Sequence, residues 1–148
     1  MGYWNMPEAT QEALEGGWLH SGDAGTMDDE DYLYIQDRIK DMVVSGGENI
    51  YPREIENTLF EHSAVADAAV IGIPSEQWGE SLLAFITLKP GETANGDDIV
   101  EFCRGKLAGY KIPRQVEFID VIPRNASGKV LKKDLREPYW KDENRRIG

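Results

Sequence analysis

Residues 65–88 read VADAAVIGIPSEQWGESLLAFITL. The two ends of this stretch, Val65–Ile73 and Leu82–Leu88, are apolar and rich in branched side chains. That composition is typical of strands buried in a sheet. The connection Pro74–Ser81 separates them. We therefore expect a hairpin of two buried strands joined by a long connection.

A helix is expected before this hairpin, beginning at Pro52. Proline suits the first position of a helix, and the acidic residues that follow, Glu54 and Glu56, suit the positive end of the helix dipole. Ile55 and Leu59 have i,i+4 spacing and so share one face of the helix.

A second helix is expected after the hairpin, capped by Gly96-Asp97-Asp98 and stopped by Gly109. Its apolar stripe consists of Ile99, Cys103 and Leu107.

The rest of the chain adds a third main strand, Val116–Ile122, and a short basic helix near Lys132–Glu137. From Lys40 onward, this order of elements predicts an α+β fold. We expect a small mixed or antiparallel β-sheet with helices packed on it.

The region before Lys40 has a different character. Gly25–Met27 and Tyr32–Gln36 are plausible paired strands around an acidic turn, and Ile39–Val44 is expected to form a short strand. Tyr3 and Trp4 resemble interior residues, yet nothing precedes them to pack against. We therefore expect the chain to begin inside a larger domain.

The composition excludes several classes of protein. A hydrophobic fraction of 41% over 148 residues is normal for a globular protein. The formal net charge of −11 argues against a nucleic-acid backbone as the main partner. A single cysteine, Cys103, excludes an internal disulfide and a CxxC metal site, and no clustered metal ligands are apparent.

The sequence shows no membrane-targeting signal. No apolar run approaches the roughly 20 residues of a transmembrane helix, and the N-terminus lacks a signal-peptide pattern. A soluble, cytoplasmic protein is the expectation.

One loop carries the strongest chemical signal. Residues 123–130 read PRNASGKV, so Lys129 follows Ser-Gly between a strand and a helix. Small residues let a backbone approach a ligand, and a lysine extends a point charge toward a phosphate or carboxylate. The loop is not a Walker motif, because Pro123 and Val130 stand where that motif has glycine and Ser or Thr.

Three other places could contribute to a site. Asp23 could accept hydrogen bonds from a ribose diol, and Arg38 could bind a hydroxyl or phosphate. The run Ser45-Gly46-Gly47 permits a tight turn and a close backbone approach. Each of these, like Lys129, also fits a plain structural role when it is considered alone.

The order of four segments resembles the adenylate-forming superfamily of acyl-CoA synthetases, peptide-synthetase adenylation domains and luciferases. These segments are residues 18–23 (WLHSGD), 37–52 (DRIKDMVVSGGENIYP), 110–113 (YKIP) and 123–129 (PRNASGK) with Leu135-Arg136 after the last. The resemblance covers nearly the whole chain.

The resemblance implies roles for individual residues. Asp23 and Arg38 would bind the nucleotide of ATP or acyl-AMP, and Lys129 would bridge the acyl carboxylate and the α-phosphate as the adenylation lysine. Lys40 would be the hinge of a domain rotation. Ser45, Gly46 and Gly47 would line the path of CoA.

The resemblance also implies that a large N-terminal domain is missing. Residues 1–39, with their hairpin, would be its last stretch, and 40–148 would be the mobile C-terminal cap. The missing domain would supply the acyl pocket and bind most of ATP and Mg²⁺, with CoA as co-substrate and a carboxylic acid as substrate. The fragment alone is expected to be inactive.

Within the superfamily, the sequence is most similar to fatty-acyl and related CoA ligases. Val44 stands where luciferases carry a lysine, and Lys40 stands where acetyl-CoA synthetases carry an aspartate. Two alternatives stay open: an adenylation domain that loads an acid onto a carrier protein, and a non-catalytic, stand-alone interaction module.

Overall fold

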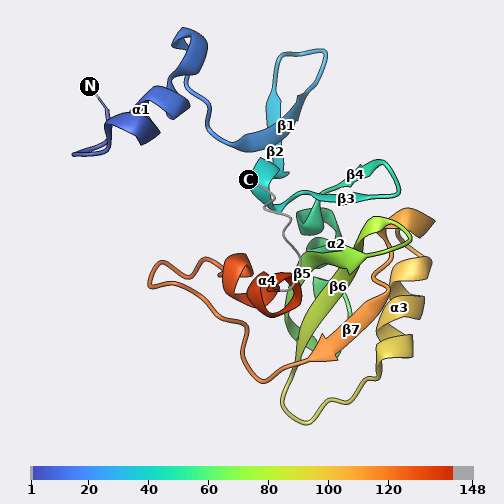
Figure 1. Ribbon diagram of the computed structural model, residues 1–148. Helices are drawn as coiled ribbons and strands as arrows, with labels where there is room; N and C mark the ends of the chain where they lie inside the picture. Colours follow the sequence, from blue (N-terminus) through green and yellow to red (C-terminus); the bar gives the residue numbers. More distant parts are fainter. Residues whose placement is uncertain (1, 142–148) are drawn as a thin grey trace. The chain divides into compact units, whose positions relative to one another are not determined.

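The computed structural model describes residues 2–141, which contain both helices and strands (Figure 1). The chain divides into two compact units, with the boundary between Ile39 and Lys40. The expected α+β class, with strands largely antiparallel, is confirmed.

The second unit is built on strand β6 (Gly79–Leu88), which pairs antiparallel with β5 (Val65–Ser75) along its whole length. Strand β3 (Val43–Ser45) pairs with the start of β6 and carries β4 (Glu48–Ile50) beside it. Strand β7 (Gln115–Phe118) pairs parallel with β6, so the sheet is mixed.

Alternation along β5 and β6 gives the sheet two apolar faces. One face includes Val70 and Ala84 and packs with residues of α2 (Pro52–Phe60) and α3 (Gly96–Arg104), among them Ile55 and Cys103. The opposite face includes Ile71 and packs with Leu135 of α4 (Lys132–Trp140). The unit therefore has helices on both faces of its sheet (Figure 1).

The central strands run further than expected. Ser75 pairs with Gly79, so the expected connection Pro74–Ser81 is wrong and only 76–78 turn the chain. Strand propensity alone does not show that pairing with a neighbour extends a ladder through polar residues.

Two other strands were predicted too long. Ile39–Asp41 forms a 3-10 turn, and strand β3 begins only at Val43. Strand β7 ends at Phe118, although the amide of Ile119 still donates to the carbonyl of Ile86.

The second predicted helix is also shorter than expected. Its cap is Asn95, whose side chain accepts from the amide of Asp98 while Asp98 accepts from the amide of Asn95. This reciprocal capping box fixes the start of α3. The helix ends at Arg104 rather than near Gly109, but Leu107 still packs against the core.

The first unit contains α1 (Pro7–Ala13), a 3-10 turn at Glu15–Gly17 and the hairpin of β1 (Asp23–Met27) and β2 (Leu33–Arg38). The hairpin and its acidic turn confirm the expected strands, whereas α1 was not predicted. No residue among 2–39 is buried. The large exposed apolar side chains of this unit are Tyr3, Trp4, Met6, Leu14, Trp18, Leu19, Met27, Tyr32, Leu33, Tyr34, Ile35 and Ile39.

In the part of the chain that the structure describes, no helix has the length and apolar character needed to cross a membrane.

Candidate functional site

Lys129 lies in an ordered loop between β7 and α4. The backbones of Arg124 and Val130 form an antiparallel bridge, and the amide of Asn125 donates to the carbonyl of Lys129 at 2.9 Å. The amide of Gly128 donates to the carbonyl of Asn125 at 2.9 Å, and Gly128 has a φ of 82°, a conformation that favours glycine. The loop is therefore closed at its base by its own backbone.

The side chain of Asn125 fills the inside of this loop. Its Oδ1 accepts from the amide and the hydroxyl of Ser127 and from the amide of Lys129, at 3.0, 2.7 and 2.9 Å. Asparagine commonly stabilises turns in this way. The Lys129 backbone is thus held on both its amide and its carbonyl.

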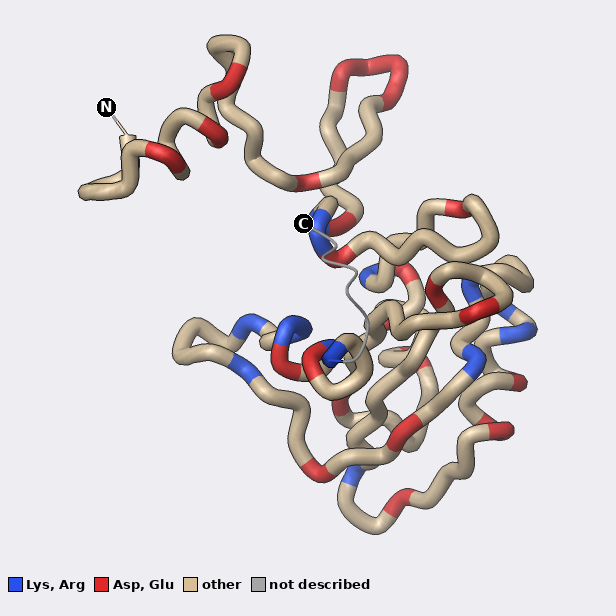
Figure 2. Tube along the Cα trace, in the orientation of Figure 1, with Lys and Arg blue, Asp and Glu red and all other residues tan. Residues whose placement is uncertain are grey.

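The ammonium group of Lys129, by contrast, has no hydrogen-bond or ion-pair partner within residues 2–141. It borders an open groove of about 610 Å³ in the second unit, which Lys40, Asn125 and Trp140 also line. Lysine and arginine residues gather on this loop and on α4 (Figure 2). Three acidic side chains, Asp41, Glu80 and Glu137, also line the groove, but lysine and arginine residues outnumber them, so the lining carries net positive charge that suits an anionic ligand.

Lys40 lies at the start of the second unit, in the 3-10 turn Ile39–Asp41. Its carbonyl accepts a hydrogen bond from Nη1 of Arg136 at 3.1 Å, and Nη2 of the same guanidinium forms an ion pair with Asp41. The position predicted as a hinge is therefore tied to α4, the helix that follows the Lys129 loop.

Ser45, Gly46 and Gly47 lie at the tip of the β3–β4 hairpin, where Ser45 ends β3 and the two glycines form the turn. Gly46 has a φ of 60°, and a Cβ added there would lie 2.9 Å from Cε3 of Trp78. Its amide donates to the carbonyl of Trp78 at 2.9 Å. Only glycine fits this position without a shift of the indole.

Asp23 and Arg38 face each other across the β1–β2 hairpin of the first unit. They are register partners, and Nε of Arg38 lies 3.0 Å from Oδ1 of Asp23. Nη1 of Arg38 also donates to the carbonyl of Ser21 at 3.1 Å. The remaining guanidinium and carboxylate edges stay accessible, because both side chains are partly exposed.

The structure brings the predicted residues together in three places. Asp23 pairs with Arg38 in the first unit, Lys40 and Lys129 border one groove in the second, and the glycine run forms its own hairpin.

Sequence reasoning missed the two ion pairs that anchor the Lys129 loop and the start of α4, Arg124–Asp67 and Lys132–Glu56. Two signals were available in the sequence. Asp67 is an acidic residue inside the otherwise apolar stretch Val65–Ile73, and Glu56 stands beside Ile55 on the apolar face of a helix.

In residues 2–141, no group of three or more His, Cys, Asp or Glu side chains is arranged to hold a metal ion.

Comparison with known proteins identifies relatives over almost the whole chain. The profile of the family described as AMP-binding enzyme C-terminal domain matches residues 54–129. A long-chain-fatty-acid–CoA ligase of Mycobacterium tuberculosis is 51% identical over 137 residues, which are 93% of this chain and 27% of that protein. A fatty acid–[acyl-carrier-protein] ligase of Streptomyces coeruleorubidus is 47% identical over 145 residues, which are 98% of this chain and 28% of that protein.

A solved structure agrees with this result. The ATP-bound MatB from Rhodopseudomonas palustris superimposes with a TM-score of 0.85 at 39% identity, covering 95% of this chain and 28% of that one. The chain therefore spans little more than a quarter of the length of the relatives that it matches.

Proposed function

This chain belongs to the family of AMP-binding enzyme C-terminal domains, and from that premise we propose that it is the C-terminal portion of an ATP-dependent, AMP-forming acyl-CoA ligase of the fatty-acid type. In this proposal, residues 1–39 end the large N-terminal domain and 40–148 form a mobile cap. The division of the chain between Ile39 and Lys40 supports this assignment.

One observation carries the proposal most directly: an ordered loop presents an unpaired lysine ammonium. The backbone of Lys129 is fixed by Asn125, while its Nζ lacks a partner within residues 2–141. A group that stabilises charge developing in a transition state has to be positioned in advance and available. The Lys129 loop has both properties.

The first reaction step needs such a cation. A carboxylate oxygen of the acid attacks the α-phosphorus of ATP, the bond to the β-phosphate oxygen breaks, and pyrophosphate leaves. Negative charge accumulates on the α-phosphate and on the entering carboxylate. The ammonium of Lys129 would neutralise part of that charge and hold the two reactants in line.

The second step needs the same space for another group. The CoA thiol, losing its proton, attacks the carbonyl carbon of the acyl-adenylate, and AMP leaves. Lys129 would withdraw and pantetheine would enter along Ser45, Gly46 and Gly47, where glycine permits a close approach. A rotation about Lys40 would exchange the two groups while one pocket excludes water.

Asp23 and Arg38 would bind the ribose and the adjoining phosphate of the nucleotide. Their pairing at 3.0 Å supports this assignment, because each orients the other while both remain partly exposed. Mg²⁺, where it accompanies ATP, would be bound mainly by the N-terminal domain. A cytoplasmic location remains part of the same proposal.

The exposed apolar side chains of the first unit support the existence of a larger partner domain. Twelve large apolar residues are exposed among 2–39, and no residue in that range is buried. Monomeric proteins rarely leave such a surface uncovered. The rest of the N-terminal domain would cover it.

A second function is favoured by one relative, the 47% identical fatty acid–[acyl-carrier-protein] ligase, whose name gives an acyl carrier protein as the acceptor. A ligase of that kind would carry out the same adenylation step as a CoA ligase and would differ only in the thiol that receives the acyl group. The identity of the acceptor thiol separates the two candidates.

The experiment that tests the proposal records pyrophosphate release from ATP, Mg²⁺ and a panel of carboxylic acids. The full-length enzyme that contains this chain is compared with the 148-residue chain alone, and CoA or a phosphopantetheine carrier protein is then added as acceptor. We expect release by the full-length enzyme only and thioester formation with CoA.

Release by the isolated chain would contradict the assignment of a cap that depends on its N-terminal domain. Exclusive transfer to the carrier protein would favour the second function. No release from either protein would favour a non-catalytic module.

A further inference from the structure

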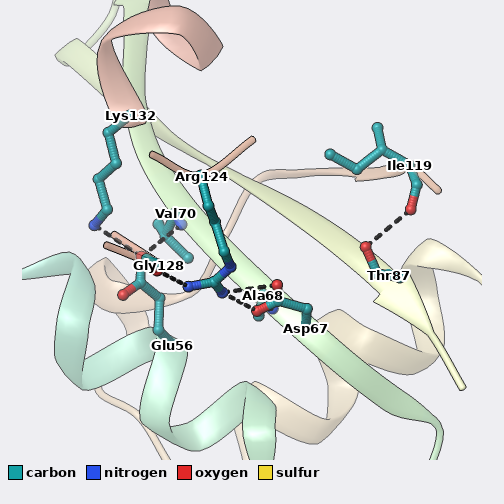
Figure 3. Close-up of polar contacts among 9 residues, drawn as sticks. All are labelled: Glu56, Asp67, Ala68, Val70, Thr87, Ile119, Arg124, Gly128 and Lys132. Atoms are coloured by element: carbon teal, nitrogen blue, oxygen red, sulfur yellow. Dashed lines mark hydrogen bonds and ion pairs between the residues drawn. The ribbon is translucent and has the colours of Figure 1, made fainter. Parts of the chain in front are cut away.

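Arg124 connects the Lys129 loop to the sheet. Its Nη2 donates to both carboxylate oxygens of Asp67, each at 2.7 Å, and its Nη1 donates to the carbonyl of Gly128 at 2.8 Å. Figure 3 shows the guanidinium between Gly128, the neighbour of Lys129, and Asp67 on strand β5. One side chain thus bridges the far end of the loop and the central hairpin.

A second ion pair fastens the chain just after the loop, where α4 begins. Nζ of Lys132 lies 2.8 Å from Oε1 of Glu56, and both side chains are nearly buried. The same oxygen accepts from the amide of Val70 at 2.9 Å, so helix α2 and strand β5 are joined to the first residue of α4 (Figure 3).

The loop needs such anchors because it has little packing of its own. Residues 124–129 are all exposed, and their internal hydrogen bonds close the turn without fixing its direction. The Arg124 guanidinium is planar and presents several donors in fixed directions. It can therefore set the orientation of Gly128 relative to β5, which an ammonium cannot do as well.

We propose that Arg124, held by Asp67, is a positioning residue that aims the Lys129 side chain for the adenylation step. This inference rests on the function proposed above. Arg124 acts through the Gly128 carbonyl and the backbone of Lys129, and it contacts neither substrate. The Lys132–Glu56 pair holds the following helix in place and serves the fold of this region.

The first test measures amide hydrogen exchange in the 148-residue chain, comparing the natural chain with Arg124→Lys. The variant keeps a positive charge but loses the two-sided bridge. We expect the amides of Gly128 and Lys129 to exchange about tenfold faster, the scale of losing one charge-assisted hydrogen bond. Amides within α3 of Arg124→Lys should exchange at the rate of the natural chain. In the control variant Arg104→Lys, which alters an exposed ion pair with Glu101, the amides of Gly128 and Lys129 should exchange at the rate of the natural chain.

The second test measures the two half-reactions of the full-length enzyme. Arg124→Lys and Asp67→Asn should each slow adenylate formation by about 10- to 100-fold, mainly in kcat, since a small misplacement of a catalytic group has effects of this size. Thioester formation from supplied acyl-adenylate should be unchanged, as should both steps in Arg104→Lys. The Tm should shift little, because the Arg124–Asp67 pair is partly exposed.

The outcomes separate the two proposals. Unchanged loop exchange or unchanged adenylation in Arg124→Lys would overturn the positioning role. Equal loss in both half-reactions would overturn it as well, because a merely structural defect affects both. Failure of the natural full-length enzyme to form an adenylate would instead refute the proposed function, while the exchange result would still decide whether Arg124 orders the loop.

Discussion

Cys103 shows how an individual residue responds to its surroundings. Its side chain is 0% exposed beneath the sheet, and burial raises the pKa of the thiol from 9.0 to about 11. Burial disfavours the thiolate, because an apolar core cannot solvate its charge. The thiol therefore acts as a small core side chain, and the expectation of a buried helix cysteine is confirmed.

This pKa predicts an alkaline loss of stability. The folded pKa is higher than the unfolded one, so the stabilising contribution is complete below pH 9 and is lost as the pH rises through 11. The full difference, two pKa units at about 1.4 kcal/mol each, is on the order of 3 kcal/mol. The measurement is the free energy of urea unfolding of the natural chain and of Cys103→Ala, determined between pH 8 and pH 11.

The comparison with Cys103→Ala isolates the thiol, because other groups titrate in both proteins. The unfolding free energy of the natural chain should fall toward that of the variant as the pH rises. Parallel pH profiles would show that the thiol keeps its ordinary pKa.

At the residue scale, the sequence identified candidate side chains but not their partners. Lys129 stood out because Ser-Gly precedes it in a loop. The Asp23–Arg38 pair depends on the register of a hairpin, and the Arg124–Asp67 pair joins residues 57 positions apart. Contacts of this kind follow from the packing of elements, which local composition does not specify.

At the scale of elements, the Glu56–Lys132 pair joins α2 to α4 across strand β5. Removing one partner of a nearly buried ion pair leaves the other charge uncompensated, which typically costs about 3–5 kcal/mol. Glu56→Ala additionally deprives the amide of Val70 of its acceptor. We expect that variant to lower the unfolding free energy by about 3–5 kcal/mol in urea denaturation.

Two comparisons make this prediction specific. Glu101→Ala, which breaks an exposed pair with Arg104, should cost at most about 1 kcal/mol. The double variant Glu56→Leu, Lys132→Met should recover part of the loss, because it removes both charges. A cost for Glu56→Ala as small as that for Glu101→Ala would refute the importance of the buried pair.

The elements also show which local signals were reliable. Pro52 marked the start of α2, and the apolar runs marked β5 and β6. The predicted strand Ile39–Val44 failed at its start, because Lys40 and Asp41 are held in a turn by Arg136. Helix α1 was missed because Pro7–Ala13 contains almost no apolar pattern, although a proline stands at its start.

At the scale of the whole molecule, the two units differ in self-sufficiency. Residues from Lys40 onward form apolar clusters on both faces of a sheet, whereas residues 2–39 contain no buried side chain. The chain also spans only 27–28% of the relatives described above. Both observations support the proposal that the second unit folds on its own and that the first belongs to a larger domain.

The proposed cycle requires the second unit to serve the two half-reactions in turn. In this proposal Lys129 acts only in the first half-reaction, so its removal should separate the two steps. The most direct measurement follows both half-reactions in single turnovers of the full-length enzyme carrying Lys129→Ala. Lys106→Ala, which alters an exposed lysine paired with Glu61, is the control.

We predict that Lys129→Ala slows adenylate formation by about 10²- to 10³-fold, the usual effect of removing a group that stabilises transition-state charge. Thioester formation from supplied acyl-adenylate should proceed at the rate of the natural enzyme, and Lys106→Ala should match the natural enzyme in both steps. Normal adenylate formation by Lys129→Ala, or an equal loss in both steps, would contradict the proposed role of the cap.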